Sequence, residues 1–347
     1  MILTLNAIAH LLVDGVCLAA LFYHGPGAGD TRFVAAVMLY NTLAFTTQCL
    51  VGLWTDRTGL SRKAEPFAML LVALGWFLPL PLTLRVAAIG LGNSCFHVCG
   101  GTVTLEQSRG KASPLGVFVA PGALGVLIGR SFPPLGNALA VMLIAMAAAV
   151  FFAYRKEGET GGTASVPSAE PLRDPLPDHR GSAFPLQAAA LLTVAVAVRA
   201  IGGCCAEFPW NTGFVTAAAM TLCVFAGKTA GGFVCDRFGA AKSSVISIVP
   251  AALLTAFLGV SMPASLLGQF LLNLSMPVTL WLLYKLMPDE PGFAFGLAAS
   301  ALWPGTLAGM MIQLSGSARA WLILISFVFG LAAVLYTVSY LKKGETT

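Results

Sequence analysis

Long apolar stretches alternate with short polar turns along the whole chain. An α-helix needs about 20 apolar residues to cross the roughly 30 Å hydrocarbon core of a bilayer. Twelve stretches approach that length, at residues 2–24, 33–54, 65–81, 83–105, 114–130, 134–154, 183–206, 213–235, 243–260, 263–286, 293–313 and 319–341. The pattern therefore predicts an all-α integral membrane protein with twelve transmembrane helices.

One long polar segment interrupts this pattern. Residues 155–182 are rich in Pro, Gly, Ser and charged residues, a composition typical of a solvated linker. They divide the predicted helices six to six, so we expect an N-terminal six-helix bundle over residues 1–154 and a C-terminal one over residues 183–347. The first apolar stretch lacks a basic segment before it and a small-residue cleavage site before Asp14, so we interpret it as a span rather than a signal peptide.

Composition and charge agree with a membrane protein. Hydrophobic residues make up 57% of the chain and charged residues 10%, whereas soluble domains carry about 25% charged residues. Basic residues gather in the loops on the side of the N-terminus, and the other side carries only Arg32, Arg85, Arg130 and Arg319. This asymmetry predicts a plasma-membrane protein with both termini and the linker in the cytoplasm. The net charge of +5 then reflects topology and gives no indication of a nucleic-acid partner.

All eight cysteines fall within or at the edges of predicted spans, which favours free thiols packed among apolar groups. The segment CFHVC at residues 95–99 resembles a metal site only until helix geometry is applied. Cys95 and Cys99 share a helix face, while His97 lies roughly 200° from each. We therefore expect neither a metal nor a cofactor.

A short charged motif occurs twice. GLWTDRTGLSRK begins at Gly52 and GGFVCDRFGAAK ends at Lys242. A shift of 180 residues carries Gly52, Asp56, Arg57 and Gly59 onto Gly232, Asp236, Arg237 and Gly239, and the same shift carries Asn93 onto Asn273 and Gly116 onto Gly296. One shift that matches both loops and helices predicts two parallel repeats, related by an axis along the membrane normal.

Such a repeat is the arrangement of the major facilitator superfamily, and GLWTDRTGLSRK resembles the signature of that superfamily between its second and third helices. Glycines in the motif allow helices to approach closely, and the Asp56 carboxylate can contact the positive N-terminal end of a helix from the other half. Arg57, Arg62 and Lys63 are the candidates to hold that carboxylate in place. These contacts would form a gate that is made in one state and broken in the other. The alternative is that the charges only enforce topology.

A narrower resemblance rests on three segments: AHLLVD at residues 9–14, GLWTD at 52–56 and GNSCFHVCGG at 92–101. They resemble motifs of the fosmidomycin-resistance branch of the superfamily, whose members export drugs in exchange for protons. Val98 and Cys99 replace the proline and the acid of the branch's fourth-helix motif, so a coupling role that needs that acid does not carry over.

Ionisable side chains within the spans indicate a site, because each is costly to place in a bilayer. His10 and Asp14 share a face of the first helix, and Asn93 and His97 share a face of the fourth. In the superfamily that the chain resembles, these two helices both line the central cavity. The resemblance therefore implies that these four side chains form one polar cluster for substrate or proton coupling. The alternative is a buried polar network that only packs the N-terminal half.

The C-terminal half supplies the opposite charge. Arg199 and Lys228 lie inside the seventh and eighth spans, and Asn273 lies near the centre of the tenth. Trp281 and Trp303 are candidate aromatic walls of a cavity. Lys228 is the repeat counterpart of Gln48, and the alternative role for Lys228 is in a gate beside Asp236; we place Glu207 at the outer mouth.

These features predict a secondary active transporter for a small anionic or zwitterionic organic solute, coupled to protons and favouring efflux by antiport. The alternatives are an uptake symporter or uniporter for a small organic acid, and a membrane receptor or enzyme built on a transporter scaffold. The chain has no phosphate-binding G-x-x-x-x-G-K-[ST] motif. We expect it to act as a monomer whose partners are its substrate, protons and the lipid bilayer.

Overall fold

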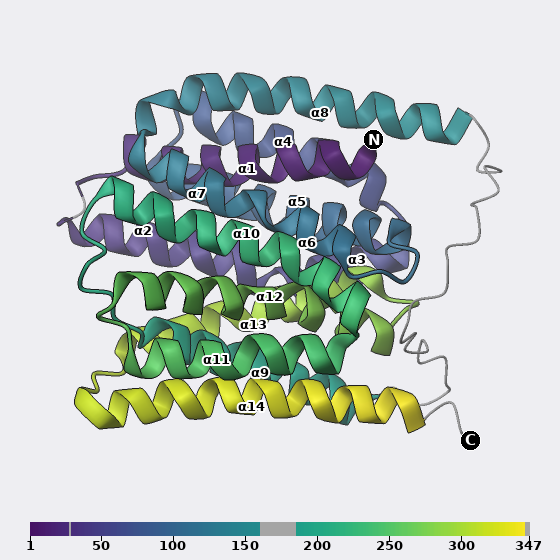
Figure 1. The fold of residues 1–347 in the computed structure, drawn as a ribbon. Helices are drawn as coiled ribbons and strands as arrows, with labels where there is room; N and C mark the ends of the chain where they lie inside the picture. The colour runs from purple at the N-terminus through teal and green to yellow at the C-terminus, as the bar shows by residue number, and fades with distance from the viewer. Residues whose placement is uncertain (28, 160–184, 344–347) are drawn as a thin grey trace.

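The computed structural model describes residues 1–27, 29–159 and 185–343, whose regular secondary structure is helical (Figure 1). The N-terminal half contains α1 (Ile2–His24), α2 (Thr31–Asn41), the π-helical turn η1 (Thr42–Thr46), α3 (Gln48–Thr58), α4 (Ser61–Phe77), α5 (Leu82–Gln107), α6 (Ser113–Val119), α7 (Pro121–Ser131), the 3-10 turn η2 (Pro133–Leu135) and α8 (Gly136–Glu159). The C-terminal half contains α9 (Leu186–Cys204), α10 (Phe214–Phe238), α11 (Ala240–Phe257), α12 (Met262–Leu286), α13 (Pro291–Met311) and α14 (Gly316–Lys343).

The prediction of twelve membrane-crossing helices agrees with this architecture. Counting α2 to α3, α6 to α7 and η2 to α8 as one helix each, 11 helices in the described ranges are long and apolar enough to cross a membrane. The twelfth, α4, is shorter, with 17 residues. The predicted linker is shorter at its start than expected, because α8 continues to Glu159; its residues 160–182 lie outside the described part of the chain.

The helices form two bundles that meet along a central seam. In the first half α1 packs against α7 and α8, and α4 packs against both α5 and α8. In the second half α9 packs against α13 and α14, and α12 packs against both α10 and α11. The seam is formed by α3 against α13 and by α6 against α10. In Figure 1, α8 and α14 lie at opposite edges of the molecule, one from each half.

Polar side chains satisfy backbone hydrogen-bonding groups at two helix ends. The buried Arg85 guanidinium, on α5, donates to Gly75 O at 2.5 Å and Trp76 O at 2.8 Å, which satisfies carbonyls in the last turn of α4. At the start of α2 the exposed Asp30 accepts from the Arg32 backbone N–H at 2.7 Å. Its hydrogen bonds with the Arg32 side chain and backbone lower the pKa of Asp30.

The fifth and second spans are both interrupted. The fifth breaks between α6 and α7 at Ala120 and Pro121, where the proline has no backbone N–H to donate to the preceding turn. The second contains η1, where a wider turn misaligns backbone groups, and Ser300 of α13 fills the gap by accepting from Cys49 N at 3.0 Å and donating to Phe45 O at 3.0 Å. The breaks in the second span therefore lie at a contact between the two halves.

Candidate functional site

A cavity of about 540 Å³ lies between the two halves. Its N-terminal wall comes from α1, α2, η1, α3, α5, α6 and α7, and its C-terminal wall comes from α9, α10, α12 and α13. Most of its surface is apolar, with Phe22, Phe33, Phe45 and Phe295 among the lining residues. A cavity of this size and character suits a small organic molecule held by a few polar groups.

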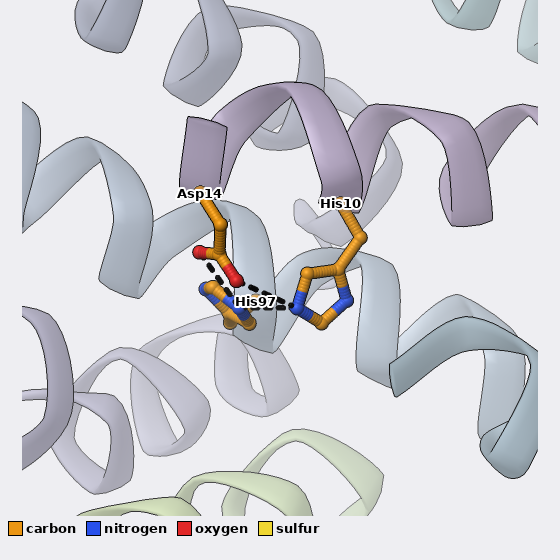
Figure 2. Close-up of side chains that lie close together, drawn as sticks. All are labelled: His10, Asp14 and His97. Carbon is orange, nitrogen blue, oxygen red and sulfur yellow. Dashed lines mark hydrogen bonds and ion pairs between the residues drawn. The ribbon is translucent and has the colours of Figure 1, made fainter. Parts of the chain in front are cut away.

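His10, Asp14 and His97 form the polar centre of the N-terminal wall. His10 Nε2 lies 2.7 Å from His97 Nε2 and 3.4 Å from Asp14 Oδ2, and His97 Nε2 lies 3.7 Å from Asp14 Oδ1 (Figure 2). Asn93 Nδ2 donates to Asp14 Oδ1 at 2.8 Å. The structure therefore brings together the four residues that the sequence places on two helix faces.

Hydrogen-bond chemistry fixes the tautomers of the neutral histidines. His97 Nδ1 lies 2.8 Å from Asn93 O, and a carbonyl oxygen only accepts, so Nδ1 carries the hydrogen. In neutral His97 the bare Nε2 then accepts from the Nε2–H of His10. His10 Nδ1 is left buried without a hydrogen-bond partner in the described residues. One hydrogen thus lies between the two rings, next to a carboxylate, and the arrangement can pass a proton among the three groups.

The same three residues offer metal-ligand atoms within 4.8 Å of one another. Two nitrogens bound 2.0–2.1 Å from a tetrahedral ion lie about 3.3 Å apart. The 2.7 Å separation of the imidazole nitrogens is a hydrogen-bond distance instead. Sharing a proton therefore fits this geometry better than holding a metal ion.

The α7 backbone closes over this cluster. A Cβ atom at Gly122 would lie 2.5 Å from Asp14 Oδ2 and would also collide with the His10 ring. A contact under 3.0 Å cannot persist, so any side chain at this position would displace the His10 ring, the Asp14 carboxylate or the helix itself. Gly122 was not among the residues that the sequence indicated.

Arg199 and Lys228 lie in the opposite wall of the cavity. Arg199 Nη1 donates to Ser275 Oγ at 2.8 Å. Within the described residues neither cation has a carboxylate within 4 Å. The cavity therefore has a carboxylate that is already hydrogen-bonded in its N-terminal wall and two cations without a paired anion in its C-terminal wall. The exposed Arg130, near the end of α7, is a further cation of the lining.

Asp56 lies at the seam, near the C-terminal end of α3 and the N-terminal end of α13. Its carboxylate accepts from Gly292 N at 2.8 Å and from Phe293 N at 2.7 Å, the first backbone donors of α13. Close approach requires two glycines here, because a Cβ at Gly52 would lie 2.5 Å from Gly292 C. The carboxylate therefore occupies the position against a helix N-terminus that the sequence predicts.

Asp236 makes the corresponding contact in the second half. It accepts from Ala112 N at 2.7 Å and from Ser113 N at 3.1 Å, at the start of α6. The donors of the two contacts are related by the same shift of 180 residues as the two aspartates. A Cβ at Gly232 would lie 2.5 Å from Ser113 Cα. Both contacts close the seam on the side of the bundle where α1 begins and α14 ends.

The basic residues of the motif do not hold Asp56 as expected. Arg62 forms ion pairs with Glu157 at 3.2 Å and with Glu106 at 3.9 Å instead, linking α4 to α8 and α5. Within the described residues, neither Arg57 nor Lys63 has a carboxylate within 4 Å. Arg237 lies over the ring of Phe238, 5.6 Å from its centre. Gly59 ends α3 with φ of 65° and Gly239 ends α10 with φ of 81°, conformations that glycine adopts without strain.

Three residues proposed for the cavity wall lie elsewhere. Asn273 donates to Gln269 O of its own helix at 2.8 Å, Trp303 Nε1 donates to Thr42 Oγ1 at 3.0 Å, and Trp281 Nε1 donates to Gly110 O at 3.0 Å. None of the three lines the cavity. Glu207 forms an ion pair with Arg319, also outside the cavity lining.

Comparison of the sequence with protein-family models and with curated proteins gives no match. The fold, however, resembles solved structures of major facilitator superfamily transporters. FucP in its outward conformation aligns with a TM-score of 0.67 and 11% identity, over 96% of this chain and 97% of that one. A structure of the E. coli fucose:proton symporter FucP aligns over the same shares with a TM-score of 0.66 and 11% identity.

A bacterial homologue of the iron transporter ferroportin, in an outward-facing state, aligns over 100% of both chains with a TM-score of 0.59 and 14% identity. The chain therefore has the major facilitator fold, and these structural neighbours are transporters rather than enzymes. At sequence identities this low, the similarity concerns the fold alone.

Proposed function

We propose that this protein is a secondary active transporter that moves a small organic anion across the plasma membrane by alternating access. The observation that carries the proposal concerns the two cations in the C-terminal wall of the cavity, Arg199 and Lys228, neither of which has a carboxylate within 4 Å in the described residues. A charge inside a membrane-spanning helix is costly unless something compensates it. An anionic substrate supplies that compensation.

The contacts of Asp56 and Asp236 support the alternating-access part of the proposal. Each joins one half of the molecule to the start of a helix in the other half, so rocking of the halves must break both. In the arrangement described here the seam is closed on the side of the termini, which we propose to be cytoplasmic. The complete cavity lies within one chain, which is consistent with a monomer as the working unit.

Proton coupling is assigned to the cluster of His10, Asp14 and His97. Lys228 of α10 is the charged group that acts on it from the other half, and Cys17 and Tyr40 are the further titratable groups around Asp14. When an anion neutralises Lys228, the electrostatic cost of a proton on the cluster changes. Proton binding and substrate binding are then linked through one cavity.

The direction of transport rests on the resemblance of three N-terminal segments to the fosmidomycin-resistance branch, which favours efflux by proton antiport. Uptake by symport would use the same residues, but the anion and the proton would then cross the membrane in the same direction. The test is counterflow and pH-gradient-driven flux of organic anions in proteoliposomes of both orientations. Flux in the direction opposite to protons supports antiport, flux with protons supports symport, and an absence of anion flux contradicts the proposal.

A further inference from the structure

Two side-chain amides extend the polar surface of the N-terminal wall beyond the histidine cluster. Asn41 and Gln48 both line the cavity, from the end of α2 and the start of α3. Asn41 Nδ2 donates to Val37 O at 2.8 Å, and Gln48 Nε2 donates to Ala44 O at 2.7 Å. Because a backbone carbonyl only accepts, the nitrogen of each amide must face it, and the amide oxygen is the end left over.

The oxygen of Gln48 lacks a partner. Gln48 is 1% exposed, and its Oε1 is buried without a hydrogen bond within the described residues. No donor to Asn41 Oδ1 is found among the described hydrogen bonds either. A buried acceptor without a donor is unfavourable, so a group that supplies one gains binding energy there. The π-helical turn η1 lies between the two residues in the chain, and its Ala44 carbonyl holds the Gln48 amide nitrogen.

The two walls of the cavity therefore favour different chemical groups of a substrate. Arg199 and Lys228 on the C-terminal wall offer positive charge, whereas Asn41 and Gln48 on the N-terminal wall offer uncharged acceptors. Asp14, the one carboxylate of the lining, already interacts with Asn93, His10 and His97. A substrate ammonium group would find only neutral amide oxygens or an occupied carboxylate, which compensate its desolvation poorly.

We propose that the transported anion also carries an uncharged hydrogen-bond donor, a hydroxyl or an amide N–H, which binds the oxygens of Gln48 and Asn41. This inference rests on the proposed function and narrows its substrate class from organic anions to hydroxy- or amido-anions. The anionic group binds Arg199 and Lys228. The apolar body lies along the phenylalanine-lined middle of the cavity, from Phe22 to Phe295.

Three compounds with one carbon skeleton separate the possibilities. 3-Phenyllactate has a hydroxyl beside its carboxylate, 3-phenylpropionate has hydrogen there, and phenylalanine has an ammonium. Binding of each to the purified full-length protein is measured by isothermal titration calorimetry. We expect phenyllactate to bind about tenfold more tightly than phenylpropionate, because only the hydroxyl satisfies the free acceptors, and phenylalanine to bind more weakly than phenyllactate.

Leucine variants test whether Gln48 and Asn41 cause the preference for phenyllactate. Gln48→Leu and Asn41→Leu should each reduce the preference for phenyllactate over phenylpropionate towards onefold. Gln269→Leu, the same substitution on α12 outside the cavity lining, should retain the wild-type preference. The comparison of the three compounds uses the wild-type protein, so it does not depend on whether a variant folds.

The outcomes separate this inference from the proposed function. Equal binding of phenyllactate and phenylpropionate, tighter binding of phenylalanine, or a preference that survives in both leucine variants would overturn the inference alone. Binding of none of the three compounds, or binding that is unaltered in the combined Arg199→Gln and Lys228→Gln variant, would contradict the proposed function and the inference together.

Discussion

Within the described residues, Asp14 is the one carboxylate of the cavity lining. It is the acid that interacts with both histidines and with Asn93, so its charge decides where a proton on the cluster resides. Asp14→Asn keeps the shape of the side chain and removes that charge. We expect the variant to lose anion flux driven by a pH gradient while retaining anion exchange between two equal pools, both measured in proteoliposomes.

Glu207→Gln is the control for this prediction, since Glu207 pairs with Arg319 away from the cavity lining. It should leave pH-gradient-driven flux close to the wild-type rate. An Asp14→Asn protein that still concentrates anion against its gradient at the wild-type rate would make Asp14 a packing residue.

Arg199 is expected to bind substrate directly. Loss of a charged hydrogen bond costs about 1.5–3 kcal/mol, which corresponds to roughly 10- to 150-fold in affinity. Arg199→Gln should weaken anion binding by this factor, measured by calorimetry, while Arg319→Gln should not. Wild-type affinity in Arg199→Gln would remove Arg199 from the substrate site.

Residue spacing was sufficient to predict the histidine cluster, and insufficient for the aromatic and amide positions. His10 with Asp14, and Asn93 with His97, are each four residues apart, and this spacing fixes a shared face on any helix. The rotation of a helix about its axis is set by tertiary packing instead. Asn273 therefore bonds to its own helix and Trp303 reaches across the seam to Thr42, although both lie near the centres of their predicted spans.

At the scale of single helices, the contact between α3 and α13 tests the gate. Asp56→Asn retains one acceptor oxygen but loses the negative charge at the start of α13, worth about 0.3–1 kcal/mol and up to about 2 kcal/mol when partly buried. We expect faster hydrogen–deuterium exchange at the Gly292 and Phe293 amides, measured by mass spectrometry, together with slower transport. Unchanged exchange and transport would reduce the motif to a signal for topology.

Gly52→Ala tests the same contact by sterics rather than charge. Its Cβ would lie 2.7 Å from Phe293 N, so α3 and α13 must separate. Overpacking of this kind costs about 1–3 kcal/mol, equivalent to a roughly 5- to 150-fold change in the ratio of two states. The expected result is increased exchange in the first turn of α13 without loss of folded protein.

The matched change on the surface is Gly158→Ala, because a Cβ there meets nothing within 4 Å. In this variant the amides in the first turn of α13 should exchange hydrogen for deuterium at the wild-type rate. Normal exchange in Gly52→Ala would show that the two helices have more freedom than the described packing allows.

The apolar pattern predicted the existence of the helices better than their irregularities. The break at Ala120 coincides with Pro121, a residue type that interrupts helices, whereas η1 contains no proline and lies where Ser300 hydrogen-bonds to the backbone of the second span. Arg85 was assigned to a loop side by its charge alone. In the structure it is buried against the end of α4, a role that depends on carbonyls from another helix.

For the whole molecule, the internal repeat is the feature that the sequence predicted most completely. Asp56 and Asp236, and also the backbone donors that they contact, are related by one shift of 180 residues. We therefore expect Asp236→Asn to increase exchange at the Ala112 and Ser113 amides and to slow transport to a similar degree as Asp56→Asn. A variant effect confined to one half would contradict symmetrical closure of the seam.

The most direct test of the account is a measurement of internal pH in proteoliposomes while organic anions are added outside. Wild-type protein should move protons only when an accepted anion is present, faster than empty liposomes do, and Asp14→Asn and Arg199→Gln should each abolish that protein-dependent signal. Coupled proton and anion movement that depends on both walls of the cavity is the predicted result. A wild-type signal no larger than that of empty liposomes, or one that both variants retain in full, would contradict it.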